Sequence, residues 1–202
     1  MSRFFKFVLT PTGMLVFANV AMYFFTSIIG GSFLETNLEI QREGNEIIIS
    51  KPAIFAQVNF LVMHGWYWQL FSAMFVHVNL VHLVGNMLFL LIFGFRAEEL
   101  FSKKVYLTIY FASGLLGNVL SLLWGPSMVS AGASGAIFGL FGANMIYLGE
   151  TFGRSITSAL IFAFFLLFLT TGIGVNFLAH FGGLAAGLLI GYALARKHKS
   201  YL

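Results

Sequence analysis

The sequence contains no cysteine and no aspartate among its 202 residues. The absence of cysteine excludes disulfide bonds, thiolate-bound zinc, iron–sulfur clusters and cysteine nucleophiles. Charge is also scarce: charged residues make up 9% of the chain, whereas soluble proteins carry about 25%. Such a chain lacks the polar groups to cover a surface in water. With 59% hydrophobic residues and a mean hydropathy of +0.90, the sequence predicts an integral membrane protein.

Six apolar segments approach the roughly 20 residues that a helix needs to cross a bilayer. No repeat of about 20–50 residues is visible along the chain. We therefore expect an all-α membrane protein, a bundle of six transmembrane helices that forms a single domain over residues 1–202. The spans are expected near residues 12–31, 79–95, 105–124, 134–149, 155–172 and 177–195.

A polar and interfacial segment, residues 32–76, separates the first two spans. Residues 35–51 hold four of the seven acidic residues and alternate in places, as a short hairpin does. Residues 52–76 are apolar but interrupted, with an aromatic cluster at Trp66 to Trp68 of the kind found at membrane–water boundaries. We expect an interfacial element here rather than a seventh span, with a plain exterior loop as the alternative.

The basic residues predict how the chain is oriented in the membrane. Nine of the 11 lie on one side of the spans, and only Arg42 and Lys51 lie on the other. The positive-inside rule then places both termini in the cytoplasm and residues 32–76 outside. We interpret the apolar run near the N-terminus as a signal anchor in the plasma membrane of a prokaryotic cell. Basic residues spread between apolar runs do not indicate a nucleic-acid partner.

Polar residues inside the spans are few, so each is informative. No glutamate falls within a span, which disfavours ion-coupled carriers and membrane metalloproteases. His82 and Asn86 share one face of the second span, while Ser134 opens the fourth and His180 lies in the sixth. His82, Ser134 and His180 each precede the next charged residue by 14–16 positions, or about 21–24 Å of helix. We expect them to meet in one layer below the outer surface.

Glycines indicate which helix faces meet. A stripe of small residues follows His180, and another surrounds Ser134. Small residues at such spacings let transmembrane helices approach closely, which would bring His180 toward Ser134. The alternative is ordinary helix packing with Ser134 as a simple N-cap, although a helix N-terminus also stabilises an oxyanion. The two stripes are Gly183, Gly187 and Gly191, and Gly132, Gly135, Gly139 and Gly142.

Three motifs in this order resemble those of the rhomboid intramembrane serine proteases. They are H-x-x-x-N in the second span (His82, Asn86), G-x-S-G at the fourth (Gly132 to Gly135) and A-H-x-x-G-x-x-x-G in the sixth (from Ala179). The resemblance covers about residues 66–195. It implies a serine endopeptidase that cleaves transmembrane segments of membrane-protein substrates near their outer ends, opening toward the outer face, with no cofactor and no metal.

The resemblance also implies roles for individual residues. Ser134 is the nucleophile, and His180 is its general base and later its general acid. The family's Ser–His dyad agrees with the absence of a carboxylate in the spans. Asn86, the Ser134 backbone N–H and His82 form the oxyanion hole. The supporting residues are Gly132 in the oxyanion loop, Phe138 against the histidine, and Gly183 and Gly187 in the sixth span.

One departure from the family pattern lies in the interfacial segment. Many relatives carry Trp-Arg there, whereas Trp68 is followed here by Gln69. Glutamine cannot form a bidentate charged contact. The hydrogen bonds that anchor this segment must therefore differ.

Three other functions are compatible with some of these residues. A membrane haem protein could use His82 and His180 as axial ligands, but this leaves Ser134 and Asn86 without a role. A catalytically inactive relative would only bind transmembrane clients, although both Ser134 and His180 are retained. A small-solute channel lacks support because no pore-lining pattern repeats. The expected partners are transmembrane substrate proteins and membrane lipid.

Overall fold

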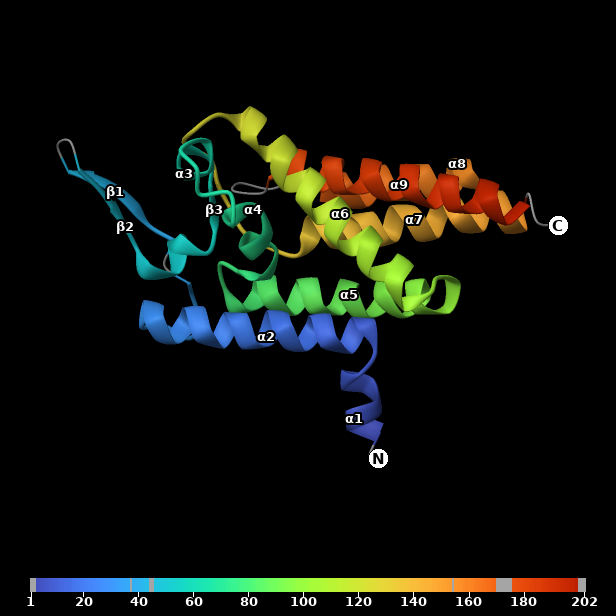
Figure 1. The fold of residues 1–202 in the computed structure, drawn as a ribbon, viewed down its shortest axis with the longest axis horizontal. Helices are drawn as coiled ribbons and strands as arrows, with labels where there is room; N and C mark the ends of the chain where they lie inside the picture. The colour runs from blue at the N-terminus through green and yellow to red at the C-terminus, as the bar shows by residue number, and fades with distance from the viewer. Residues whose placement is uncertain (1–2, 37, 44–45, 154, 170–175, 200–202) are drawn as a thin grey trace. The chain divides into compact units, whose positions relative to one another are not determined.

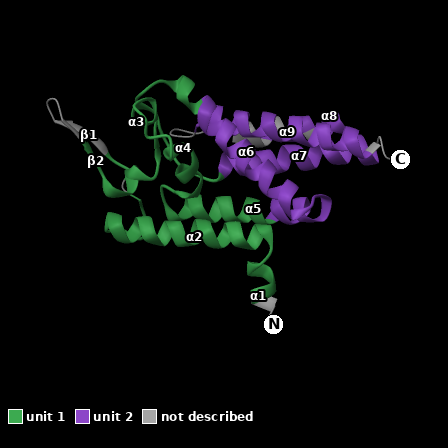
Figure 2. Ribbon diagram, in the orientation of Figure 1, with its two compact units in different colours: residues 1–91, 121–133 green, residues 92–120, 134–202 purple. Residues whose placement is uncertain are grey.

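The computed structural model describes residues 3–36, 38–43, 46–153, 155–169 and 176–199. Its chain divides into two compact units (Figure 2). Unit 1 comprises residues 1–91 and 121–133, and unit 2 comprises residues 92–120 and 134–202. The expectation of a single domain over residues 1–202 stays a prediction.

Unit 1 contains two helices near the N-terminus, a hairpin and a series of short elements (Figure 1). It also contains the first half of α5 (Leu80–Leu100). Its other elements are α1 (Arg3–Val8), α2 (Pro11–Gly30), β1 (Ile40–Glu43), β2 (Glu46–Ile49), η1 (Lys51–Ile54), β3 (Gln57–Val58), α3 (Asn59–Met63), α4 (Gln69–Ser72), η2 (Ala73–Phe75), η3 (Leu122–Trp124) and β4 (Val129–Ser130).

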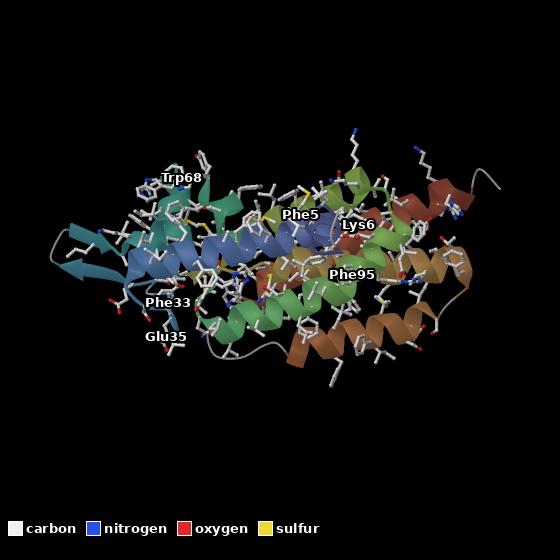
Figure 3. The ribbon with its side chains drawn as sticks, turned by 90° about the horizontal axis from the view of Figure 1, so that it is seen from below. Phe5, Lys6, Phe33, Glu35, Trp68 and Phe95 are labelled. Atoms are coloured by element: carbon white, nitrogen blue, oxygen red, sulfur yellow. The ribbon has the colours of Figure 1, made fainter. Side chains whose placement is uncertain are left out.

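Helix α2 has capping residues at both ends. The Thr10 side chain accepts a hydrogen bond from the Gly13 N–H at 3.1 Å, and Pro11 occupies the first turn, where its missing N–H costs nothing. Gly31 ends the helix in the left-handed conformation, with φ of 73°. Phe33 and Glu35 follow this end (Figure 3). The short α1 that precedes α2 is not among the elements expected from the sequence.

The expected hairpin within residues 35–51 is confirmed. Strands β1 and β2 pair antiparallel, with Ile40 opposite Ile49 and Glu43 opposite Glu46. In a hairpin, the backbone N–H and C=O groups that face the partner strand form hydrogen bonds with it. A polar segment between two membrane helices can therefore fold without further partners for these groups.

Residues 52–76 form no long helix. The longest helix among them, α3, has five residues, whereas a span needs about 20. No helix of these residues is long enough to span a membrane, and the interfacial position of the segment stays a prediction. The Trp66 and Trp68 rings stack with centroids 4.9 Å apart. Trp68 remains half exposed (Figure 3).

The described residues of unit 2 form helices: the end of α5, α6 (Lys103–Ser121), α7 (Ser134–Phe152), α8 (Ile156–Leu169) and α9 (Phe177–Lys199). Helices α7 and α9 run alongside each other (Figure 1). Phe138, Phe141 and Leu184 form the core between them. Ser134 lies on α7 and His180 lies on α9.

A helix occupies each of the six expected spans, but the boundaries differ. The helices of the second, fourth and sixth spans extend to Leu100, Phe152 and Lys199, beyond the expected ends at 95, 149 and 195. The first charged residue marks the end of the apolar stretch, yet lysine, arginine and glutamate are good helix formers and continue the helix into water. Residues 170–172 of the fifth span lie outside the described residues.

Four of the described helices are long and apolar enough to cross a membrane. They cover Pro11–Gly30, Leu80–Leu100, Lys103–Trp124 and Phe177–His198. The chain is therefore a mostly helical membrane protein, and the count of six spans stays a prediction.

Candidate active site

Ser134 is the first residue of α7. Gly132, two residues earlier, has φ of 134°, a left-handed conformation that strongly favours glycine. This turn lets the chain enter the helix at Ser134. The first N–H groups of a helix have no partner within it, so Ser134 lies at the positive end of the α7 dipole.

His180 lies in the first turn of α9, which Asn176 caps. The Asn176 Oδ1 accepts a hydrogen bond from the Ala179 N–H at 3.1 Å, and its carbonyl accepts from the His180 N–H at 3.2 Å. Asn176 is not among the site residues expected from the sequence. Its signal is an asparagine three residues before the alanine of the A-H motif, the spacing of an N-cap.

Glycines lie in the interface between α7 and α9. A Cβ on Gly183 would overlap the Gly135 carbonyl, and one on Gly187 would overlap the Gly139 carbonyl. Gly191 lies against the Ala143 backbone in the same way. The helices can approach this closely only where Cβ atoms are missing.

The close approach brings Ser134 and His180 together. The His180 Nε2 lies 2.7 Å from the Ser134 Oγ, within hydrogen-bond distance. His180 is 6% exposed, whereas Ser134 is half-buried. The Phe138 ring packs on the imidazole with centroids 4.9 Å apart and planes inclined by 31°. A hydroxyl held against a shielded imidazole is the arrangement of an activated nucleophile and its base.

No carboxylate on these two helices lies beside the histidine. Glu150 is the only acid in α7 and α9, and it follows Ser134 by 16 residues, about 24 Å along the helix. A Ser–His pair without a third acidic member therefore fits the local sequence.

His82 and Asn86 lie on α5 within unit 1. The Asn79 Oδ1 caps this helix by accepting the His82 N–H at 2.7 Å. The buried Asn86 donates from Nδ2 to the His82 carbonyl at 2.9 Å. Ser134 and His180 belong to unit 2, so a shared oxyanion hole stays a prediction.

His77 is fully buried just before α5, and its ring meets that of His82 edge-on with centroids 5.2 Å apart. Burial, followed by the neighbouring His82, lowers the pKa of His77 to about 3, although the Phe75 backbone favours its charged form. His77 is therefore neutral in the folded protein at physiological pH.

The pKa of His77 predicts acid sensitivity. Between pH 6.5 and about 3 the unfolded chain protonates His77 and the folded chain does not. The free energy of unfolding therefore keeps its full contribution from neutral His77 above pH 6.5. On acidification below that pH it falls by up to about 1.4 kcal/mol per pH unit. Thermal unfolding in detergent at pH 7.5 and pH 5 should show this loss.

The His77→Phe variant should unfold with a weaker pH dependence, because the buried titrating group is gone. The exposed His64 provides a control, and His64→Gln should keep the wild-type dependence. If the unfolding temperatures of His77→Phe and wild type depend equally on pH, His77 is not the source of the acid sensitivity.

Asn144, 1% exposed in α7, is a second polar residue that the sequence motifs do not predict. Its Nδ2 donates to the Phe93 carbonyl on α5 at 2.9 Å. A hydrogen bond of this kind links two helices within the apolar unit 2. Among the described residues, no group of three or more histidine and acidic side chains could hold a metal ion.

Comparison with known proteins bears on this site. The family model described as "Rhomboid domain" matches residues 64–197, which include all of α5, α6, α7 and α8 and most of α9. The chain belongs to the rhomboid family. The resemblance indicated by the motifs is thereby confirmed.

Several named relatives share this region. The chain is 31% identical over 147 residues to the putative rhomboid protease YdcA of Bacillus subtilis, covering 69% of this chain and 73% of YdcA. It is 32% identical over 194 residues to the rhomboid protease GluP of Bacillus subtilis, covering 92% of this chain and 35% of GluP. It is 37% identical over 139 residues to RHOMBOID-like protein 6, mitochondrial, of Arabidopsis thaliana, covering 66% and 45%. The chain thus spans less than half the length of the last two relatives.

Proposed function

We propose that this rhomboid-family chain is an intramembrane serine endopeptidase with Ser134 and His180 as its catalytic dyad. The observation that carries the proposal is the 2.7 Å separation between Ser134 Oγ and His180 Nε2 at the start of α7. The protease names of YdcA and GluP support the same activity.

The first step is attack of Ser134 Oγ on the carbonyl carbon of a substrate peptide bond. The His180 Nε2 accepts the hydroxyl proton, which requires the tautomer that carries its hydrogen on Nδ1. Phe138 covers the imidazole and holds its plane, so that Nε2 stays aimed at Oγ.

Negative charge then develops on the former carbonyl oxygen. The Ser134 backbone N–H at the α7 N-terminus is one donor for this oxyanion. Asn86 is the second: its Nδ2 carries two hydrogens, and the hydrogen bond to the His82 carbonyl uses one of them. His82 is the third member proposed from the family motif, and Gly132 permits the turn that presents the Ser134 N–H.

Collapse of the tetrahedral intermediate breaks the C–N bond. His180 returns the proton to the departing amine, and the acyl group remains on Ser134. Water then attacks the acyl-enzyme with His180 again accepting a proton, which releases the carboxylic acid and regenerates the hydroxyl.

The apolar helices around the dyad favour substrates that are themselves membrane segments. A helical peptide bond is sterically closed to attack, so small or helix-breaking residues in the substrate ease local unwinding. We place both termini in the cytoplasm and the site toward the outer face of the plasma membrane, as the basic residues predict.

Labelling with a fluorophosphonate probe tests the proposal. The purified wild-type protein should be labelled, because the probe phosphonylates an activated serine. Ser134→Ala should not be labelled. The exposed Ser158 on α8 offers a matched control, and Ser158→Ala should label at the wild-type rate.

An unlabelled wild type, or equal labelling of Ser134→Ala, would overturn the proposed function. An absorbance scan of the same sample distinguishes the protease from the haem protein, because a Soret band would indicate bound haem. The hydrogen bond to Ser134 argues against haem because it already engages Nε2 of His180.

A further inference from the structure

Three buried amide side chains lie in the segment between α2 and α5. Gln57, Asn59 and Gln69 are all fully buried. Burying an amide is costly unless its polar atoms form hydrogen bonds. The partners of these side chains therefore identify which parts of the backbone they stabilise.

Gln69 joins the start of α4 to η1 and β3. Its Oε1 accepts the Val58 N–H at 2.9 Å, and its Nε2 donates to the carbonyls of Ile54 at 3.1 Å and Ala53 at 3.4 Å. One side chain thus satisfies three backbone groups from two different elements. These three hydrogen bonds anchor the segment at the position where the resemblance leads us to expect an arginine.

Arginine could not replace this network. An arginine side chain has five donors and no acceptor, so it could not accept the Val58 N–H. The position in this chain requires both a donor and an acceptor within one planar group, which the amide of Gln69 supplies.

Asn59 and β3 hold the loop that leads to the nucleophile. The Asn59 Nδ2 donates to the carbonyls of Ser121 and Gly125, both at 2.8 Å. The Asn59 backbone N–H donates to the Met128 carbonyl at 3.0 Å. Strand β3 pairs with β4, with Val58 opposite Val129. The loop after η3 is thus attached at several points to the segment that Gln69 anchors.

A second connection between Gln69 and the residues before Ser134 is more direct. The Ala73 carbonyl accepts the Gly132 N–H at 2.9 Å. Ala73 lies four residues after Gln69, one turn further on, where α4 ends and η2 begins. A displacement at the start of this turn therefore moves the carbonyl that holds Gly132, two residues before Ser134.

We infer that Gln69 is a positioning residue that fixes the 131–133 loop ahead of Ser134 without touching the substrate. It acts through α4 and the Ala73–Gly132 hydrogen bond, and through β3 and its pairing with β4. The inference rests on the proposed function. In that reaction the loop sets where the Ser134 N–H points when the oxyanion forms.

The Gln69→Met variant tests this role because it keeps the side-chain length and removes all three hydrogen bonds. Cleavage of a transmembrane substrate in liposomes should show kcat reduced about 10- to 100-fold, with KM within about twofold of wild type. Affinity for a peptide boronate, which mimics the tetrahedral intermediate, should fall by a similar factor to kcat.

A control separates positioning from general destabilisation. The Tyr23 hydroxyl on α2 donates to the Phe33 carbonyl at 2.7 Å, away from the loop in sequence and hydrogen bonding. Tyr23→Phe removes this hydrogen bond and should leave kcat within about twofold when assayed below its unfolding temperature.

A milder variant keeps the inference testable if Gln69→Met does not fold. The Ser72 Oγ donates to the Phe55 carbonyl at 2.8 Å and holds the same turn of α4. Ser72→Ala should lower kcat about threefold without a change in KM. Wild-type kcat in a folded Gln69→Met, or in Ser72→Ala where Gln69→Met fails to fold, would overturn the inference.

The two proposals fail in different ways. A wild-type protein that neither labels nor cleaves overturns the proposed function and this inference with it. An active wild type beside an unimpaired Gln69→Met, or a Tyr23→Phe variant that loses as much kcat as Gln69→Met, overturns only the role of Gln69.

Discussion

Replacing His180 by asparagine should reduce the turnover of a membrane substrate by about 10³-fold or more. The His180 Nε2 lies 2.7 Å from the Ser134 Oγ, and general-base catalysis contributes about 10²–10⁴-fold to reactions of this kind. Asparagine keeps a polar side chain but cannot accept a proton near neutral pH. Steady-state cleavage of a fluorescent transmembrane substrate in liposomes measures the effect.

Non-additivity gives a sharper test of the dyad. Ser134→Ala combined with His180→Asn should be no slower than the slower single variant, because the two residues act as one unit. His198 lies on α9, as His180 does, but is exposed, and it provides a matched control. His198→Asn should retain wild-type turnover. A His180→Asn variant with a tenth or more of wild-type turnover would contradict the role of the histidine as base.

A single methyl group at Gly187 should greatly reduce activity and destabilise the protein. The added Cβ would overlap the Gly139 carbonyl oxygen, a backbone atom that no side-chain rotation can move. Helices α7 and α9 must then separate, which lengthens the contact between Ser134 and His180. We expect Gly187→Ala to lose more than about 100-fold in labelling rate. Overpacking of this kind costs about 3 kcal/mol, and the unfolding temperature falls by roughly 6–12 °C.

Gly85 on α5 offers the matched substitution. An added Cβ there meets no heavy atom within 4 Å, and alanine favours helix over glycine by about 1 kcal/mol. Gly85→Ala should therefore keep or raise the unfolding temperature. If thermal unfolding and labelling of Gly187→Ala match those of Gly85→Ala, the glycines do not control the α7–α9 distance.

Much of the architecture could be predicted from the sequence because apolar length and helical spacing are local properties. The six apolar segments each contain a helix, and the described residues between them form no further long helix. The helix ends were predicted less well, because hydropathy reports where a chain leaves the bilayer and not where its backbone hydrogen bonds stop.

The sequence by itself determined the membrane class and the family motifs, and the shared membrane depth of Ser134 and His180 stays a prediction. The 2.7 Å between Ser134 Oγ and His180 Nε2 depends on how α7 and α9 pack, since the two residues are 46 positions apart in the chain. Only the tertiary structure identified the three partners of Gln69 and the hydrogen bond from Gly132 to Ala73. These partners are backbone groups, which every residue carries, so no residue pattern can mark them in advance.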